Sequence, residues 1–220
     1  MIIAIDGPAG AGKSTVSRGL AKALGFLFLD TGAMYRAVAL KVLESGADPE
    51  SETQCRETAE RHRLSFDPAG KILIDGTPGE PDVRSERVEK IVSAVSAHPR
   101  VRAVIVARQQ AIASAAHGVV AEGRDTTTVV FPRAELKFFL NASAAERARR
   151  KAHQVGAPER QRAIESDLLR RDTIDSTRAH SPLVKAPDAL VIETDGKSPE
   201  QVIAELLAHV HARRAAAPRE

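Results

Sequence analysis

The stretch IIAIDGPAGAGKST, residues 2–15, decides the fold, because it joins a short apolar run to a loop almost without side chains. The run at residues 2–5 indicates a buried strand, and a helix is expected to begin at Lys13. From Gly7 to Ser14 the loop fits the pattern G-x-x-x-x-G-K-[ST], in the strand-to-helix context that the pattern requires. Backbone N–H groups reach a phosphate closely only where side chains leave room. The stretch therefore predicts a phosphate-binding loop.

Two side chains of this loop have predicted roles. Lys13 is expected to reach the β- and γ-phosphates, and the Ser14 hydroxyl to ligate Mg²⁺. The positive end of the following helix adds to the attraction. A glycine-rich turn without a ligand is the alternative. The full pattern in this context favours binding of a purine nucleoside triphosphate, and it leaves open whether water or a metabolite accepts the phosphoryl group.

Four more apolar runs follow, at residues 26–29, 118–121, 136–140 and 189–193. They do not alternate with polar residues and are separated by helical stretches, which is typical of a parallel sheet covered on both faces. The predicted class is α/β, in one domain. Ser143 and Ser198 carry helix-capping signatures, and the last eight residues, RRAAAPRE, are expected to fray. The helices are expected at residues 13–24, 32–45, 84–96, 99–116, 143–153, 158–173 and 199–213.

Residues 63–85 interrupt this alternation. They contain two short candidate strands, at residues 63–66 and 71–75, joined by a turn at residues 67–70. This pattern predicts a hairpin insertion. In an α/β nucleotide enzyme such an insertion could cover a substrate, and a decorative surface insertion is the alternative.

Composition limits the partners. The formal net charge is +3 and aromatic residues make up 3% of the chain, which does not match the dense basic and aromatic surface of a nucleic-acid-binding protein. There is no apolar run of about 18 residues, and the first residues lack the basic flank and cleavage site of a signal peptide. The single cysteine, Cys55, fits a reducing compartment. We therefore expect a cytoplasmic protein that binds a small anion, with no nucleic acid and no membrane as partner.

Four further motifs extend the pattern of the opening loop: LDTGAMYRA at residues 29–37, SAVSAHPRVR at 93–102, AEGRDTTTVVFP at 121–132 and RRDTIDSTRAHSPL at 170–183. With the loop, they resemble bacterial cytidylate kinases from residue 2 to about residue 207. The resemblance implies the nucleoside monophosphate kinase fold, a five-stranded parallel sheet flanked by helices in a single kinase domain over residues 1–220. It also implies a monophosphate-binding insertion at about residues 63–85 and a lid at about residues 149–160.

The resemblance further implies an activity. Such a kinase moves the γ-phosphoryl group of ATP to CMP or dCMP, giving ADP and CDP or dCDP in pyrimidine nucleotide metabolism. ATP is then the co-substrate, Mg²⁺ the metal, and a monomer the expected state. The implied catalytic residues are Lys13, Arg124, Arg171 and Arg178. The implied ATP-binding residues are Gly7, Pro8, Ala9, Gly10, Ala11, Gly12, Lys13, Ser14 and Thr15. The implied CMP-binding residues are Thr31, Tyr35, Arg36, Ser93, Arg102, Arg124, Asp125, Arg171, Asp175 and Arg178.

The residue types suit this chemistry. Phosphoryl transfer needs positioning and positive charge, which arginines supply. The spacing from Arg171 through Asp175 to Arg178 places all three on one helical face if the helix continues through Ser176, and an ordinary solvated ion-pair face is the alternative. A lid could also bring basic groups over ATP. The candidates for that role are Arg147, Arg149, Arg150 and Lys151, and an ordinary solvated charge on a helix is the alternative for each.

The expected cytosine pocket needs an acceptor for the N4 amino group and a donor for O2 or N3. Asp125 and Ser93 can accept, and Arg102 can donate. Uracil carries an acceptor at position 4 and would leave Asp125 without a partner, so UMP is predicted to be a poor substrate.

The match to the family departs at two threonines. Family sequences usually carry an apolar residue and a glycine where this chain has Thr126 and Thr127. If that glycine uses a positive φ, the β-branched Thr127 is expected to be strained there.

Two other functions compete with cytidylate phosphorylation. One is another small kinase with the same loop, acting on shikimate, AMP or dephospho-coenzyme A, which would not need Asp125 opposite an amino group. The other is a nucleotide-dependent switch that hydrolyses ATP or GTP slowly. Two features of the sequence speak against a switch: it lacks a guanine motif of the NKxD type, and it has a surplus of arginines for an acceptor site.

Overall fold

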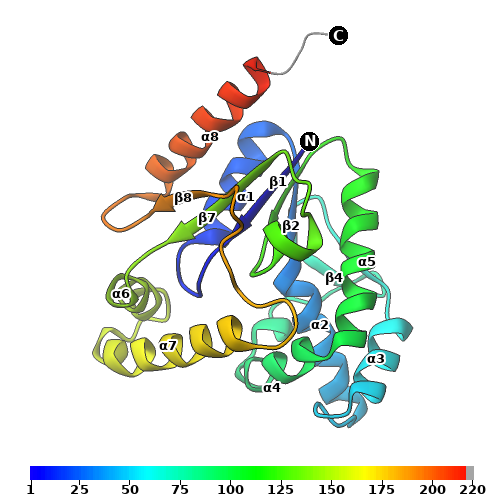
Figure 1. The fold of residues 1–220 in the computed structure, drawn as a ribbon. Helices are drawn as coiled ribbons and strands as arrows, with labels where there is room; N and C mark the ends of the chain where they lie inside the picture. Colours follow the sequence, from blue (N-terminus) through cyan, green and yellow to red (C-terminus); the bar gives the residue numbers. More distant parts are fainter. Residues whose placement is uncertain (217–220) are drawn as a thin grey trace. The chain divides into compact units, whose positions relative to one another are not determined.

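The computed structural model describes residues 1–216 and contains a five-stranded parallel sheet (Figure 1). The order of the strands is β2-β6-β1-β7-β8. Each strand begins within one residue of its predicted position, so the predicted α/β class and the five-stranded sheet are confirmed. The strands are β1 (Ile2–Asp6), β2 (Leu27–Asp30), β6 (Val119–Glu122), β7 (Leu136–Asn141) and β8 (Leu190–Glu193).

The chain divides into two compact units. Unit 1 is residues 1–26 with the chain from Gly118 onward, and unit 2 is residues 27–117. In unit 1, β1 lies between β6 and β7, with Ile3 opposite Val120 on one side and Leu136 on the other. Ile3, Ile5 and Phe138 are fully buried, and removing such side chains from water is the main force that holds a sheet core together. The helices of unit 1 are α1 (Lys13–Leu24), α6 (Ala144–Gln154), α7 (Gln161–Thr177) and α8 (Pro199–Ala215).

Helix α8 packs against α1, and α6 lies beside α7 (Figure 1). Gly19 of α1 faces Ile203 of α8, and a Cβ on Gly19 would lie 2.4 Å from Cδ1 of Ile203, so a larger residue there would require that side chain to move. The predicted capping box at Ser198 is complete, with the Gln201 side chain accepting from the backbone of Ser198. Helix α8 runs to Ala215, two residues beyond its predicted end at residue 213, and residues 217–220 of the predicted frayed tail lie outside the described residues.

Unit 2 carries the predicted hairpin. Strands β3 (Leu64–Phe66) and β4 (Ile72–Ile74) are antiparallel, and β5 (Thr77–Pro78) extends them to a three-stranded sheet. The turn closes where expected, as Gly70 N–H donates to the Asp67 carbonyl at 2.9 Å. The helices of this unit are α2 (Thr31–Ser45), α3 (Glu52–Arg61), α4 (Glu86–Ala97) and α5 (Pro99–Ala115).

Three helix predictions need correction. Helix α3 is absent from the predicted set, although Ser51 caps it by accepting from the Gln54 N–H. Helix α7 begins at Gln161, after a 3-10 turn at Pro158–Arg160, and continues to Thr177 rather than to residue 173. At Ser143 only the forward half of the capping box forms, because the Ser143 N–H donates to the Asp195 carboxylate instead.

Within residues 1–216, none of the helices combines the length and apolar composition that a membrane crossing needs.

Candidate active site

The segment of residues 7–14, which leads from the end of β1 into the first turn of α1, has room only for backbone at its first position. Gly7 has φ +148°, and a Cβ there would lie 2.1 Å from the carbonyl oxygen of Leu140. Gly12 is the N-cap of α1 in the left-handed conformation, with φ 87°, and no side chain caps the helix. The first N–H groups of a helix have no partner within it, so this end of α1 suits an anion. We call residues 7–14 the phosphate loop.

Lys13 is folded back onto the phosphate loop. Its Nζ donates to the carbonyl oxygens of Gly7 and Pro8, both at 2.8 Å, and the residue is only 6% exposed. Burial lowers the pKa of Lys13 to about 7, and the positive charge of Arg124 adds to the shift, while nearby carboxylates oppose it. Lys13 is therefore a buried amine whose charge a polyphosphate would restore.

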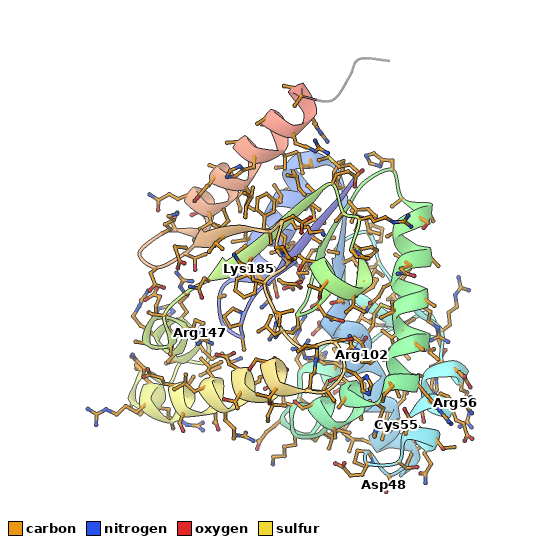
Figure 2. The ribbon with its side chains drawn as sticks, in the orientation of Figure 1. Asp48, Cys55, Arg56, Arg102, Arg147 and Lys185 are labelled. Carbon is orange, nitrogen blue, oxygen red and sulfur yellow. The ribbon has the colours of Figure 1, made fainter. Side chains whose placement is uncertain are left out.

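Arg147 on α6 joins the phosphate loop to α7 (Figure 2). The guanidinium is buried, and its Nη1 donates to the Ala9 carbonyl at 2.9 Å and pairs with the Asp172 carboxylate at 2.6 Å. Asp172 in turn accepts from the Ala9 N–H at 3.3 Å. In this arrangement Arg147 supports the outer side of the loop.

Two further arginines of α6 are also engaged, while Lys151 is exposed on the same helix. Arg149 and Arg150 both pair with Glu146, at 2.7 and 2.8 Å. These two arginines hold the pKa of the Glu146 carboxyl at about 2, mainly through the hydrogen bond from Arg149. Arg150 also donates to the hydroxyl and carbonyl of Thr194, next to β8. Each of these arginines is thus tied to a neighbour within unit 1.

A charged cluster follows β6. Arg124 Nε lies 2.8 Å from Asp175 Oδ2, and Arg178 Nη2 lies 3.8 Å from Asp125 Oδ1. Asp125 and Asp175 are both buried. Because α7 continues through Ser176, the spacing condition on Arg171, Asp175 and Arg178 is met, with Arg178 as the C-cap residue. Unit 1 therefore brings together four of the predicted site residues, from segments about 50 residues apart in sequence.

Thr126 and Thr127 bond to Asp6 and are not strained. They begin a π-helical turn, Thr126–Val130. Among residues 1–216, the non-glycine residues with positive φ are Asp75 and Ser181, so the condition for strain at Thr127, a positive φ, is not met. Both hydroxyls donate to the Asp6 carboxylate at 2.6 Å. The two threonine hydroxyls, which the usual family residues lack, are thus bonded to the Asp6 carboxylate inside unit 1.

Unit 2 holds the other predicted residues. Thr31, Tyr35 and Arg36 lie on α2, and the guanidinium carbon of Arg102, on α5, lies 5.1 Å from the centre of the Tyr35 ring. Such stacking of a cation on an aromatic face is attractive. Arg102 is 5% exposed, and its Nη1 donates to the Ser96 carbonyl at 3.1 Å.

Ser93 lies on α4, which packs against both α2 and α5. Its carbonyl accepts from the Ser96 hydroxyl at 3.2 Å, and the Ser96 carbonyl in turn holds Arg102. Ser93 and Arg102 are thus linked through one turn of α4. Three helices therefore position Tyr35, Ser93 and Arg102, which we call the α2–α4–α5 cluster.

An ion pair beside Thr31 is missing from the sequence-based prediction. Asp30 caps α2 by accepting from the Ala33 N–H at 2.9 Å, and its other oxygen lies 3.0 Å from Arg84 Nη2. Arg84 also pairs with Glu80 at 2.8 Å. An aspartate directly before a helix is a recognisable cap, but no pattern in the sequence indicates a partner 54 residues away.

The chain matches a family model described as cytidylate kinase over residues 3–212. It is 46% identical over 209 residues to a cytidylate kinase of Mycolicibacterium paratuberculosis, covering 92% of each chain. It is also 46% identical over 219 residues to a cytidylate kinase of Pelotomaculum thermopropionicum, covering 96% of each. Among solved structures, an uncharacterized protein from Eubacterium ventriosum has a TM-score of 0.54 at 10% identity, covering 96% of this chain and 99% of that one. That last likeness concerns the fold alone.

Proposed function

The chain belongs to the cytidylate kinase family, and from this premise we propose that it transfers the γ-phosphoryl group of ATP to CMP or dCMP. The products are ADP and CDP or dCDP. The observation that carries the proposal in unit 1 is the phosphate loop, where glycines leave only backbone beside a buried lysine. A loop of this kind suits phosphoryl transfer, because catalysis of that reaction consists almost entirely of positioning and electrostatic stabilisation.

ATP binds along residues 7–15 in this proposal. The backbone N–H groups at the start of α1 face the phosphates, and Lys13 exchanges its two carbonyl partners for phosphate oxygens. Ser14 is exposed in the first turn of α1, so its hydroxyl oxygen is accessible to Mg²⁺, a cation that prefers oxygen ligands. The metal, when bound, neutralises charge on the β- and γ-phosphates.

Arginines stabilise the charge of the transferring group. Arg124, Arg171 and Arg178 join Lys13 in this role, and the support is their position in unit 1 around the end of α7. The ion pair between Asp175 and Arg124 at 2.8 Å fixes the direction of the guanidinium. A cation held in advance costs little reorganisation during the reaction.

CMP is recognised by residues of α2, α4 and α5 together with Asp125. Arg36 binds the α-phosphate, and Tyr35 forms a wall of the pocket. Asp125 and Ser93 accept from the cytosine amino group, and Arg102 donates to O2 or N3. The support for Arg102 is that its guanidinium is already buried and oriented by Tyr35 and Ser96.

The remaining expectations belong to the same proposal. Residues 63–85 act as the monophosphate-binding insertion, and residues 149–160 act as the lid, within one kinase domain. The chain works as a monomer in the cytoplasm, in pyrimidine nucleotide metabolism, without nucleic acid or membrane as partner. The modest net charge of +3 supports the exclusion of nucleic acid.

A panel of acceptors tests the proposal. ADP formation from MgATP is measured with CMP, dCMP, UMP, AMP, shikimate or no acceptor. Turnover with CMP or dCMP far above all the others is the expected result. Preference for AMP or shikimate would assign the chain to another kinase activity, and hydrolysis independent of any acceptor would point to a nucleotide switch.

A further inference from the structure

The Asp6 carboxylate is a buried acceptor with an unusual set of donors. Oδ1 accepts from the backbone N–H of Thr126 at 2.9 Å and from its hydroxyl at 2.6 Å. Oδ2 accepts from the N–H of Thr127 at 2.7 Å and from its hydroxyl at 2.6 Å. All three residues are buried. We call these four hydrogen bonds the Asp6 clamp.

The Asp6 clamp joins two functional segments of unit 1. Asp6 ends β1 and directly precedes the phosphate loop, while Thr126 and Thr127 directly follow Arg124 and Asp125. On the other side of that pair, the Gly123 N–H donates to the Ile5 carbonyl at 3.0 Å. The segment with Arg124 and Asp125 is therefore fastened to the end of β1 at both of its ends.

The clamp uses the full capacity of the carboxylate. A carboxylate offers about four acceptor positions, and the two threonines fill four. An apolar residue and a glycine at these positions, the usual family pattern, can offer at most their two backbone N–H groups. The hydroxyls of this chain therefore double the number of donors, with short charge-assisted bonds of the stronger kind.

We propose that Thr126 and Thr127 are positioning residues for phosphoryl transfer, which hold Arg124 and Asp125 in register with the phosphate loop through Asp6. The inference rests on the proposed function. Its physical basis is that catalysis by positioned charge depends on the placement of the charge, and a displacement of about 1 Å can lower the rate about 100-fold. Asp6 itself contributes position, since its acceptor sites are already occupied by the chain.

The test removes the hydroxyls and keeps the shape. In the variant Thr126→Val/Thr127→Val, kcat with saturating CMP is expected to fall about 10- to 100-fold. The Kd of MgATP, measured by calorimetry, is expected to stay within about threefold, because the phosphate loop is untouched. Thr126→Ser/Thr127→Ser keeps the donors and should restore kcat. Thr128→Val is the matched control, because the Thr128 hydroxyl reaches the Asp125 carbonyl at 3.5 Å and not Asp6.

The outcomes separate three situations. If the wild type does not prefer CMP or dCMP to the other acceptors, the proposed function is wrong, and this inference is wrong as well. If the wild type is active and the double valine variant keeps its kcat per ATP-binding site, with only a lower melting temperature, the clamp is merely structural and the inference alone is overturned. Should the double variant not fold, Thr127→Val keeps three of the four bonds, and a kcat within twofold of the wild type would overturn the inference.

Discussion

The phosphate loop of unit 1 and the α2–α4–α5 cluster of unit 2 are built from different materials. The loop presents backbone, and Gly7 and Gly12 hold conformations that side chains rarely adopt. The cluster presents side chains, with Arg102 stacked on Tyr35 at 5.1 Å and anchored to Ser96. One is made by contiguous residues, and the other by helices that meet only after folding. We therefore expect changes in the loop to affect every acceptor, and changes in the cluster to affect the acceptor alone.

The largest expected effect is that of Lys13→Met. Removing a preorganised cation from the transferring phosphate is expected to lower kcat about 100- to 1,000-fold with every acceptor. Initial rates with CMP, dCMP and UMP measure it. Lys22→Met is the matched control, because Lys22 is an exposed lysine of the same helix. A loss confined to CMP would break the contrast between the two regions.

Arg102→Gln tests the α2–α4–α5 cluster. Losing a charged donor to the base is expected to raise the KM for CMP about 10- to 100-fold and to leave the KM for ATP within about threefold. Arg100→Gln is the control, since Arg100 is an exposed neighbour on α5 that pairs with Glu52. Equal rises in both KM values would contradict the division of roles. A melting curve separates this effect from lost packing against Tyr35.

Asp125→Ala sharpens the comparison, because Asp125 belongs to unit 1 and is proposed to read the base. A lost hydrogen bond to the cytosine amino group costs about 1 to 3 kcal/mol, so the ratio of kcat/KM for CMP over UMP is expected to fall about 10-fold. Asp167→Ala serves as control, since Asp167 is exposed on α7. An unchanged ratio would remove Asp125 from base recognition and leave it as the ion-pair partner of Arg178.

The smallest expected effect is the uptake of a proton when MgATP binds. With a pKa of about 7, Lys13 is mostly neutral at pH 8 in the free protein. Phosphate binding should return its charge, so MgATP binding at that pH is expected to take up most of a proton. Calorimetry in two buffers of different ionisation enthalpy measures this uptake. Lys13→Arg, which stays charged, should show none. It follows that the affinity for MgATP falls as pH rises above about 7.

The same group affects stability with a definite sign. In the unfolded chain Lys13 keeps its proton up to its ordinary pKa of 10.5, whereas the folded chain releases it near 7. The unfolded state therefore binds more protons between these values. The contribution of Lys13 to the free energy of unfolding rises with pH across that window and is constant below it.

The parts of the fold that depend on neighbouring residues were predictable. The five apolar runs marked the strands, and the capping residues Ser143 and Ser198 marked the starts of α6 and α8. Helix α3 was not predicted, because it buries only small or polar residues and therefore shows little apolar periodicity. These residues are Cys55, Thr58 and Ala59. Its one clear signal was Ser51 three residues before Gln54.

The parts that depend on distant pairs were not predictable. Thr127 suggests strain when compared with the glycine of the family, because its partner Asp6 lies about 120 residues earlier. The ion pair of Asp30 with Arg84 and the hydrogen bond from Arg147 to the Ala9 carbonyl also join residues that are far apart in sequence. Motifs indicated which residues matter, while the choice of partner follows from tertiary packing. The roles of the site residues stay predictions until the variants above are measured.

In the free protein, two carbonyl oxygens of the phosphate loop, those of Gly7 and Pro8, already accept hydrogen bonds from Lys13 Nζ. An incoming anion must outcompete two internal carbonyls for the same ammonium group. Binding free energy is then a difference between two satisfied states, and it favours anions that replace both bonds at once. A triphosphate can present oxygens of two neighbouring phosphates to Nζ, whereas a single phosphate ion presents oxygens around one phosphorus only, so we expect the loop to favour the longer anion before any base is recognised.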